Sequence, residues 1–259
     1  MQEQLLLSGD TLEELAIARL QEFEPWALSM SDKGYWLAFS GGKDSCVILD
    51  LAERAGVKYE PVYNLTTADP PELVHFIRKR HPEVRVVKPP ETMWQLIRRK
   101  KMPPRRMARF CCEVLKERGG QGRMVVTGIR WAESARRSKR RMTEACFRDK
   151  NRHFLHPIID WPTETVWGYI RRRGLPYCSL YDEGFDRVGC VLCPMACDTE
   201  RQMARWPKIA ASWERAVKET FKPDDGRWGS ADEYWAWWLN RRAPSLERDD
   251  DNMLLFEDQ

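Results

Sequence analysis

The sequence lacks any run of 18 apolar residues, so no transmembrane helix is expected. A signal peptide is not expected either, because the segment after Met1 holds only three leucines and is too acidic. We therefore expect a cytoplasmic protein without a membrane partner. The 259 residues contain no internal repeat and no low-complexity linker. This length suits one large α/β domain, or one domain with a small appendage.

Disulfides are not expected among the eight cysteines, because thiols stay reduced in the cytoplasm. Their spacing indicates ligand or redox sites instead. Cys111 and Cys112 are adjacent, and Cys190 and Cys193 form a Cys-x-x-Cys pair. Cys46 stands alone on an apolar helix face, where we expect it to pack in the core.

Short apolar runs alternate with segments of helical periodicity up to about residue 130. The predicted strands are 35–39, 59–65, 84–87 and 124–127, and the predicted helices are 11–28, 46–55, 69–80 and 92–101. Strands that alternate with helices predict an α/β fold, in which a parallel sheet carries helices on both faces.

The pattern changes beyond residue 160, where helices dominate. Residues 163–173 and 198–219 are predicted to be helical, and residues 174–197 form a loop that carries cysteines. A last helix contains three tryptophans, which as large apolar side chains are expected in a core rather than on a base-stacking surface. They are Trp235, Trp237 and Trp238.

These patterns divide the chain into three parts. The parts are an N-terminal helix (1–32), an α/β domain (33–160) and a cysteine-bearing loop with a helical region packed on that domain (161–259). A parallel sheet binds ligands beyond the carboxyl ends of its strands. Such ends are followed by Ser40, by Thr66 and Thr67, and by Gly128. We therefore expect three segments to converge at one edge of the sheet.

A glycine-rich loop joins the first predicted strand to its helix. It consists of Ser40, Gly41, Gly42, Lys43, Asp44 and Ser45. Two glycines permit a close backbone approach, and amides at a helix N-terminus point at an anion. Lys43 adds a positive charge, the serines add hydroxyl donors, and Asp44 either orients the loop or helps to hold Mg²⁺. The spacing is not that of a Walker A loop. A phosphate site is predicted, with a generic tight turn as the alternative.

This loop resembles the pyrophosphate loop (PP-loop) of the adenine nucleotide alpha hydrolase-like superfamily. That group includes ATP pyrophosphatases, the small subunit of ATP sulfurylase and the phosphoadenosine phosphosulfate (PAPS) reductase family. The resemblance implies a five-stranded-type parallel sheet and an adenine nucleotide bound at residues 40–45. In the ATP pyrophosphatases, the nucleotide is cut between its α- and β-phosphates.

A second motif follows the fourth predicted strand. It contains Gly128, Arg130, Glu133, Ser134 and Arg137. Gly128 permits a sharp exit from the strand, and Glu133 holds an arginine in place. The two arginines suit bidentate contacts to phosphate or sulfate oxygens. A salt-bridged helix start is the alternative on residue types alone. The spacing is similar to the Gly-x-Arg-x-x-Glu-Ser-x-x-Arg signature of PAPS reductase-like proteins, which implies nucleotide contacts here.

The two cysteine pairs supply four thiolates, which suit a [4Fe–4S] cluster or a structural Zn²⁺. Unliganded buried thiols are the remaining alternative. The arrangement looks like the Cys-Cys plus Cys-x-x-Cys set that holds a [4Fe–4S] cluster in adenylyl-sulfate (APS) reductases, so we favour the cluster over zinc. Cys178 or Cys197 is an alternative for one ligand. The expected ligands are Cys111, Cys112, Cys190 and Cys193.

The resemblance covers residues 33–197 and breaks in two places. Sulfonucleotide reductases attack sulfur with a cysteine in a C-terminal Glu-Cys-Gly-Leu-His segment, whereas this chain has no cysteine after Cys197. Without that thiolate, the covalent S-sulfo intermediate is not expected. The Ser-Gly-Gly-Lys-Asp-Ser loop is also the form of ATP-using relatives. Both departures favour an ATP-using, cluster-bearing relative, such as the ATP pyrophosphatase component of DNA phosphorothioation systems.

The expected reaction begins with ATP and Mg²⁺ at the sheet edge, with the adenine near Leu65 and Thr66. An acceptor oxygen attacks the α-phosphate, and positive side chains stabilise the charge on the departing pyrophosphate. Sulfur then displaces AMP, with the cluster accepting or presenting it, so a sulfur or electron donor protein is expected. The catalytic candidates are Lys43, Asp44, Arg130 and Arg137.

Basic residues gather in a first basic segment (98–109), with seven Lys or Arg, and a second basic segment (136–141), with five in six positions. Such runs are either solvated helix faces or surfaces for phosphates, and the latter predict a nucleic-acid acceptor. Two other functions stay open. One is a sulfonucleotide reductase that uses a thiol in trans, and the other is a non-catalytic nucleotide-sensing module.

Overall fold

The computed structural model describes residues 11–147, 149–225 and 227–240. The chain divides into two compact units, Met1–Pro89 with Leu115–Cys190, and Pro90–Val114 with Val191–Gln259. The boundaries differ from the three parts expected from the sequence, because residues 90–114 group with the C-terminal helices. None of the helices in the described ranges combines the length and the apolar character needed to cross a bilayer.

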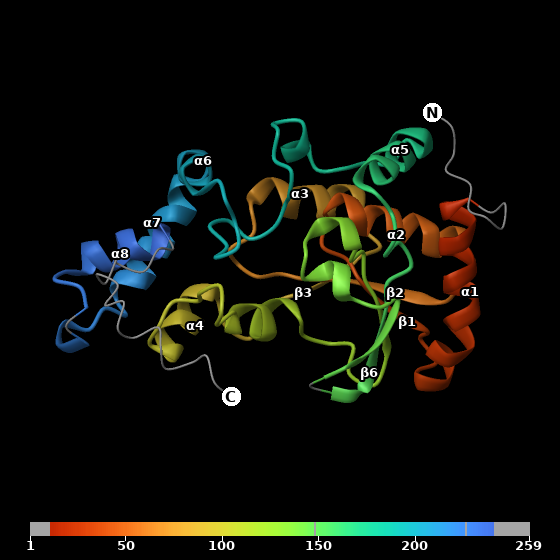
Figure 1. The fold of residues 1–259 in the computed structure, drawn as a ribbon, viewed down its shortest axis with the longest axis horizontal. Helices are drawn as coiled ribbons and strands as arrows, with labels where there is room; N and C mark the ends of the chain where they lie inside the picture. Colours follow the sequence, from red (N-terminus) through yellow and green to blue (C-terminus); the bar gives the residue numbers. More distant parts are fainter. Residues whose placement is uncertain (1–10, 148, 226, 241–259) are drawn as a thin grey trace, which may run out of the picture. The chain divides into compact units, whose positions relative to one another are not determined.

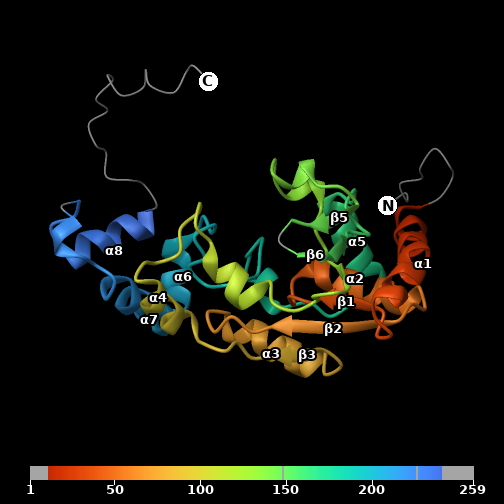
Figure 2. The same cartoon turned by 90° about the horizontal axis from the view of Figure 1, so that it is seen from below.

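The first unit is built around a six-stranded sheet of order β3-β2-β1-β4-β6-β5. Its strands are β1 (Tyr35–Ala38), β2 (Tyr59–Asn64), β3 (Arg85–Val87), β4 (Met124–Val126), β5 (Thr143–Cys146) and β6 (Asp149–Leu155). Five strands run parallel, and β5 pairs antiparallel with β6. Strand β1 pairs in parallel with β2, whose arrow is visible in Figure 2. The predicted α/β fold with a five-stranded-type parallel sheet is confirmed, and β5 extends it at one edge.

Helices of the first unit follow the predicted alternation closely. They are α1 (Leu12–Met30), α2 (Lys43–Arg54), α3 (Pro71–Arg80) and α5 (Thr163–Arg173), with short 3-10 turns η2 (Trp131–Glu133), η3 (Arg137–Lys139) and η4 (Ser179–Tyr181). Figure 1 shows α1 and α5 beside α2. The core lies between the helices and the sheet, where Leu37 of β1, Ile48 of α2 and Val126 of β4 are fully buried. Burying these apolar side chains is the main stabilising contribution.

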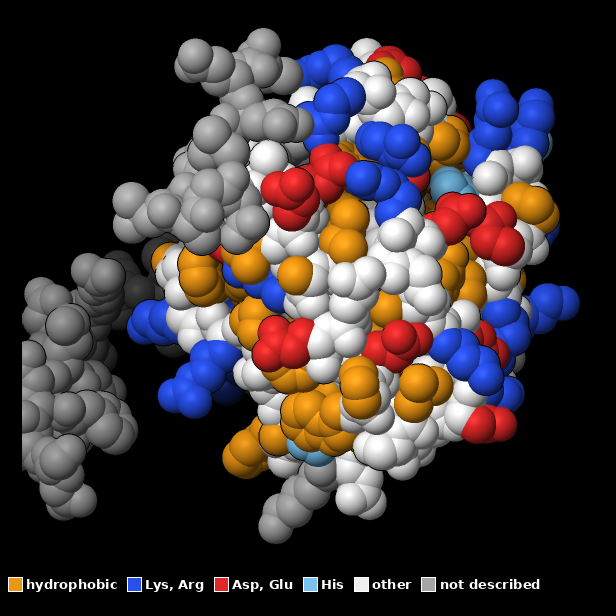
Figure 3. Space-filling view, turned by 90° about the vertical axis from the view of Figure 1, so that its right-hand side faces the viewer, with side chains coloured by type: hydrophobic (Ala, Val, Ile, Leu, Met, Phe, Trp, Pro, Cys, Tyr) orange, Lys and Arg blue, Asp and Glu red, His pale blue; other side chains and the backbone are white. Residues whose placement is uncertain are grey.

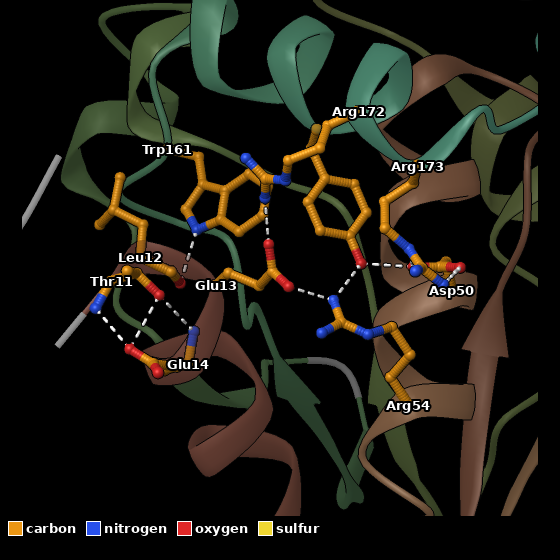
Figure 4. Close-up of polar contacts among 10 residues, drawn as sticks. Thr11, Leu12, Glu13, Glu14, Asp50, Arg54, Trp161, Arg172 and Arg173 are labelled. Carbon is orange, nitrogen blue, oxygen red and sulfur yellow. Dashed lines mark hydrogen bonds and ion pairs between the residues drawn. The ribbon is translucent and has the colours of Figure 1, made fainter. Parts of the chain in front are cut away.

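The amino end of α1 is fixed by polar contacts to α2 and α5. On the molecular face drawn in Figure 3, lysine and arginine side chains lie next to aspartates and glutamates. Thr11 and Glu14 form the capping box predicted from the sequence, with Glu14 N–H donating to Thr11 Oγ1 at 3.2 Å. Glu13 pairs with Arg54 of α2 and with Arg172 of α5 (Figure 4). These contacts hold three helices of the unit together at one end.

The second unit consists mainly of helices. They are α4 (Met93–Lys100), α6 (Thr199–Arg205), α7 (Pro207–Lys218) and α8 (Ala231–Asn240), with the 3-10 turn η5 (Pro223–Asp225) and the π-helical turn η1 (Cys112–Lys116) at the junction with the first unit. Trp238 of α8 stacks on Trp213 at 4.9 Å between ring centroids, and both side chains are buried. Trp235 is buried as well, so the predicted core role of these two α8 tryptophans is confirmed.

Candidate functional site

The loop of residues 40–45 carries the chain from β1 into α2. Gly41 has a φ of +71°, which L side chains rarely adopt, and a Cβ there would lie 2.5 Å from Leu73 Cδ1. Gly42 is the N-cap of α2, which begins at Lys43. The first amides of a helix have no partner within the helix. The two glycines therefore place helix-terminal N–H groups at the carboxyl edge of the sheet, as an anion site requires.

The two serines of the loop hold its shape. Ser45 Oγ donates to Gly42 O at 2.7 Å, so its hydroxyl hydrogen is used inside the loop. Ser40 Oγ accepts from Gly42 N at 3.4 Å and lies 3.3 Å from Ser45 Oγ. Both serines thus contribute to preorganisation of the loop.

Asp44 lies between two cations. Its Oδ1 accepts from Arg130 Nε at 2.7 Å, and its Oδ2 is 3.4 Å from Lys43 Nζ. The Arg130 side chain is 1% exposed and the Lys43 side chain 8% exposed. One carboxylate between two buried cations leaves a net charge of about +1, and water screens it little at this depth. This group of three charges favours an anion at the loop.

Arg130 is the most deeply buried member of the group. Its Nη1 donates to Trp161 O at 2.9 Å and lies 3.3 Å from Thr163 Oγ1. Its backbone N–H donates to Glu133 Oε2 at 3.0 Å. In this placement the guanidinium faces Asp44 and the start of α5. Arg130 therefore adds charge to the site and positions Asp44.

Gly128 and Arg137 complete the second motif. A Cβ on Gly128 would lie 2.9 Å from Asp44 Cβ and 3.0 Å from Asp44 C, so only glycine lets the segment after β4 approach the loop this closely. Glu133 pairs with Arg137, which bears out the prediction that this glutamate holds an arginine. The Arg137 side chain is 34% exposed and keeps part of its guanidinium accessible.

The end of β2 supplies the third segment of the edge. Leu65 N–H donates to Val87 O at 3.0 Å and extends the pairing with β3. Thr66 is 2% exposed, its amide donates to Asp69 Oδ2 at 2.7 Å, and its Oγ1 lies 3.3 Å from Cys190 Sγ. Because β1, β2 and β4 are parallel neighbours, the three predicted segments do follow strand ends on one edge.

The eight cysteines form no disulfide. Cys46 is 3% exposed, and burial raises the pKa of its thiol, so the predicted packing role is confirmed. The four expected cluster ligands are thiols, the donors that a [4Fe–4S] cluster takes, and the donor chemistry therefore fits. Over the described residues, however, no group of three or more His, Cys, Asp or Glu side chains is arranged to hold a metal ion.

Both basic segments are partly neutralised by ion pairs. In the first, Arg98 and Arg99 pair with glutamates. In the second, Arg137 and Arg140 do the same. Part of the positive charge of each segment is therefore balanced by glutamates of the same chain.

Two polar residues at the sheet edge were missed by the sequence prediction. Tyr181 in η4 accepts a hydrogen bond from Lys43 N–H at 3.0 Å. His156 follows β6, is fully buried, and has its Nδ1 2.7 Å from Thr127 Oγ1. Burial lowers the pKa of His156 to about 3, so its ring is neutral. A lone tyrosine or histidine outside a motif carries no sequence signal of such a contact.

Comparisons with known proteins agree with these observations. The sequence profile of the phosphoadenosine phosphosulfate reductase domain matches residues 34–196. An uncharacterised protein of Methanocaldococcus jannaschii is 32% identical over 203 residues, which cover 72% of this chain and 42% of that protein. The chain spans about half the length of this relative and of a second one from the same organism.

A shorter relative is covered more fully. An adenosine 5'-phosphosulfate reductase of Staphylococcus epidermidis is 25% identical over 216 residues, which cover 78% of this chain and 88% of that protein. Among solved structures, the PAPS reductase of Candida auris in its phosphate complex aligns with a TM-score of 0.49 and 18% identity. That alignment covers 72% of this chain and 96% of the other.

Proposed function

The chain belongs to the phosphoadenosine phosphosulfate reductase family, and on this basis we propose that it is an enzyme that acts at the phosphate end of an adenine nucleotide. The observation that carries the proposal is the group of Lys43, Asp44 and Arg130 at the start of α2. We propose ATP as the nucleotide, because the sequence Ser-Gly-Gly-Lys-Asp-Ser of the loop is the form that resembles ATP-using relatives.

In the proposed reaction, ATP enters with Mg²⁺ as substrate, and its adenine lies near Leu65 and Thr66. An acceptor oxygen attacks the α-phosphorus, a new P–O bond forms, and the bond to pyrophosphate breaks. Lys43 and the exposed part of Arg137 neutralise charge on the leaving pyrophosphate. Arg130 acts through Asp44, whose carboxylate it fixes at 2.7 Å. A preorganised charge of this kind costs no reorganisation during the reaction.

The adenylated acceptor is a substrate for sulfur transfer. A sulfide equivalent would attack the acceptor atom that carries the adenylated oxygen and form a bond to it, while AMP leaves with that oxygen. The sulfide equivalent comes from a donor protein. The basic segments make a nucleic acid the proposed acceptor, since lysine and arginine contacts to phosphates supply most non-specific affinity for nucleic acids.

We also propose a [4Fe–4S] cluster held by Cys111, Cys112, Cys190 and Cys193, with zinc as the alternative. When bound, such a cluster supplies a site that accepts or presents sulfur. Anaerobically purified protein should be brown, with a broad visible absorbance, and iron analysis should give about four iron atoms per chain. A colourless, zinc-loaded preparation would contradict the cluster and leave the nucleotide site standing.

A second candidate is sulfonucleotide reduction with a thiol supplied in trans. The likeness to an adenosine 5'-phosphosulfate reductase over 88% of that protein's length favours it. In that reaction, a thiolate of an external dithiol would attack the sulfur of the sulfonucleotide, an S–S bond would form, and the nucleotide phosphate would leave. The second thiol of the dithiol would then form a disulfide and release sulfite.

One experiment separates these functions. The anaerobic protein is incubated with ATP, APS or PAPS in the presence of a nucleic acid, sulfide and a dithiol, and pyrophosphate, AMP and sulfite are measured. Pyrophosphate and AMP from ATP would support the first function, and sulfite from a sulfonucleotide the second. Tight nucleotide binding without any product would favour a non-catalytic sensing module.

The same assay tests the loop. Lys43→Ala should weaken nucleotide binding by about tenfold or more, because it removes a charge-assisted contact. Lys79→Ala on α3 is the matched control, since it removes an exposed lysine elsewhere in the same unit. Full nucleotide affinity in Lys43→Ala would refute the role of the loop.

A further inference from the structure

Tyr181 reaches the phosphate loop from a distant part of the first unit. Its hydroxyl oxygen lies 3.0 Å from Lys43 N, and the two residues are 138 positions apart. The Lys43 ammonium lies over the Tyr181 ring, 5.6 Å from its centroid. A Cβ on Gly42 would lie 3.4 Å from the same hydroxyl. The tyrosine therefore touches both the backbone and the charged end of the residue that begins α2.

The turn that carries Tyr181 is firmly anchored. In η4, Leu180 is 1% exposed, and the nearby Phe185 is 5% exposed. The Tyr181 ring meets the ring of Trp167 edge-on, with 5.1 Å between centroids and 85° between planes. One buried residue within the turn, another shortly after it and an edge-on aromatic contact favour one side-chain position. The hydroxyl is thus a fixed feature of the loop environment.

The hydroxyl of Tyr181 has one hydrogen left to give. Because it accepts from Lys43 N–H, its own O–H points to a different acceptor. Burial is the main cause that raises the pKa of Tyr181, so the hydroxyl stays protonated at neutral pH. Accepting from an amide at a helix N-terminus also polarises the O–H and strengthens it as a donor. The corresponding hydrogen of Ser45 is already used on Gly42 O.

We propose that Tyr181 is a phosphate-binding residue: its hydroxyl takes the Lys43 amide hydrogen and donates its own hydrogen to a phosphate oxygen bound at the loop. The inference rests on the proposed function, since it requires a phosphate at residues 40–45. It adds a donor from outside both signature motifs. It also gives the 3-10 turn after α5 a role in binding.

The test compares two tyrosines of one aromatic cluster by isothermal titration calorimetry with Mg²⁺–ATP and with pyrophosphate. Tyr181→Phe should bind both ligands about tenfold more weakly, because a hydrogen bond to a charged group is lost. Tyr177→Phe is the matched control. Its ring also packs on Trp167, at 5.4 Å between centroids, but its hydroxyl is bonded to Asp182. It should bind as the wild type does.

Three results would overturn the inference. Tyr181→Phe binding as tightly as the wild type, or more tightly, would mean that the hydroxyl is neutral or competes with phosphate. Equal losses in both variants would assign the effect to aromatic packing. If the wild type bound neither ATP nor pyrophosphate, the proposed function would be contradicted together with the role of Tyr181. If only the role of Tyr181 were wrong, the wild type would still bind both ligands. Thermal unfolding of each variant confirms that the proteins compared are folded.

Discussion

At the scale of single residues, Asp44 is where the two signature motifs meet. A carboxylate beside a phosphate site is unfavourable by itself, because like charges repel. Here it is held by Arg130 at 2.7 Å and lies 3.4 Å from Lys43 Nζ, so the net charge remains positive. Without a nucleotide, Asp44 compensates two buried cations that would otherwise lack a counter-charge. With a nucleotide, the phosphate shares that role.

Gly128 should be sensitive to the smallest substitution. In Gly128→Ala the added Cβ would lie 2.9–3.0 Å from Asp44 atoms, including backbone atoms, so the loop or the segment after β4 has to shift. We expect a loss of about 1–3 kcal/mol in the free energy of unfolding, measured in urea. We also expect about tenfold weaker ATP binding by calorimetry, since a displaced Asp44 no longer fixes the charges.

Gly189→Ala is the control for this steric effect, because the methyl group it adds has no atom within 4 Å apart from those of its neighbours in the chain. It should leave stability and binding unchanged. Wild-type behaviour of Gly128→Ala in both measurements would show that the loop tolerates movement at this point.

His156 predicts a pH dependence of stability. Its pKa is lowered to about 3 in the folded protein by burial and by nearby arginines, against 6.5 for the free side chain. As pH falls through 6.5 the unfolded chain takes up a proton that the folded protein does not. The stabilisation is therefore complete above pH 6.5 and declines below it, by about 2 kcal/mol between pH 7 and 5.

Urea unfolding of the wild type and of His156→Gln at both pH values checks this expectation. The glutamine cannot be protonated in this range, so the variant should lose less stability on acidification. The same loss in both proteins would assign the pH dependence to other groups.

At the scale of elements, apolar periodicity predicted most strands and helices of the first unit, but it did not predict the strands with a polar sequence. Strands β1 to β4 carry short apolar runs, buried throughout in β4 and in part in β1 and β2, and these runs were predicted to within about two residues. Strand β6 begins Asp-Lys-Asn-Arg and lacks a long apolar run, although it lies between β4 and the edge strand β5, so apolar periodicity did not reveal it. The helix expected over 198–219 is two helices, since Pro207 lacks the N–H that would continue the first.

The candidate site shows the same limit. The loop and the second motif are local patterns, so their residues could be predicted. That Arg130 faces Asp44 depends on a contact across 86 positions, and the Tyr181 contact spans 138. Sequence spacing alone does not encode which side chains meet across such separations. The predicted metal ligands were inferred only from the short spacing within each cysteine pair, and that spacing does not show whether the two pairs meet.

The capping box of α1 should contribute measurable stability. Thr11→Ala removes the acceptor for Glu14 N–H, a bond of 3.2 Å. We expect the free energy of unfolding to fall by about 1 kcal/mol. Urea unfolding followed by circular dichroism measures it. Ser29→Ala, which removes an exposed hydroxyl bonded to Trp26 O within the same helix, is the control and should change stability less. An equal effect of both substitutions would contradict a specific capping role.

At the scale of the whole molecule, two compact units share one chain, and each carries a basic segment. The first basic segment lies in the second unit, and the second basic segment lies in the first. Ion pairs occupy some of these arginines, and the whole chain has a net charge of +4. On this basis we propose a phosphate-rich acceptor as the partner.

A salt series tests the nucleic-acid acceptor. Neutralising Arg136 and Lys139 should weaken binding to a duplex DNA oligonucleotide and reduce the slope of log K against log salt by about 1–2. Fluorescence anisotropy at several salt concentrations measures both. The control is Lys79→Ala with Arg80→Ala, which removes the same charge from α3. Equal slopes for the two double variants would contradict a role of the second basic segment.

The long sequence separation between the glycine loop and its partners Arg130 and Tyr181 also affects when the site can form during synthesis of the chain. During translation, the glycine loop is synthesised 86 positions before Arg130, and Tyr181 is added later still. Until then, Asp44 has no guanidinium to hold it and the Lys43 amide has no hydroxyl to bind. We expect a nascent chain that ends before residue 130 to show little affinity for nucleotide. Ligand capture would therefore begin only late in translation.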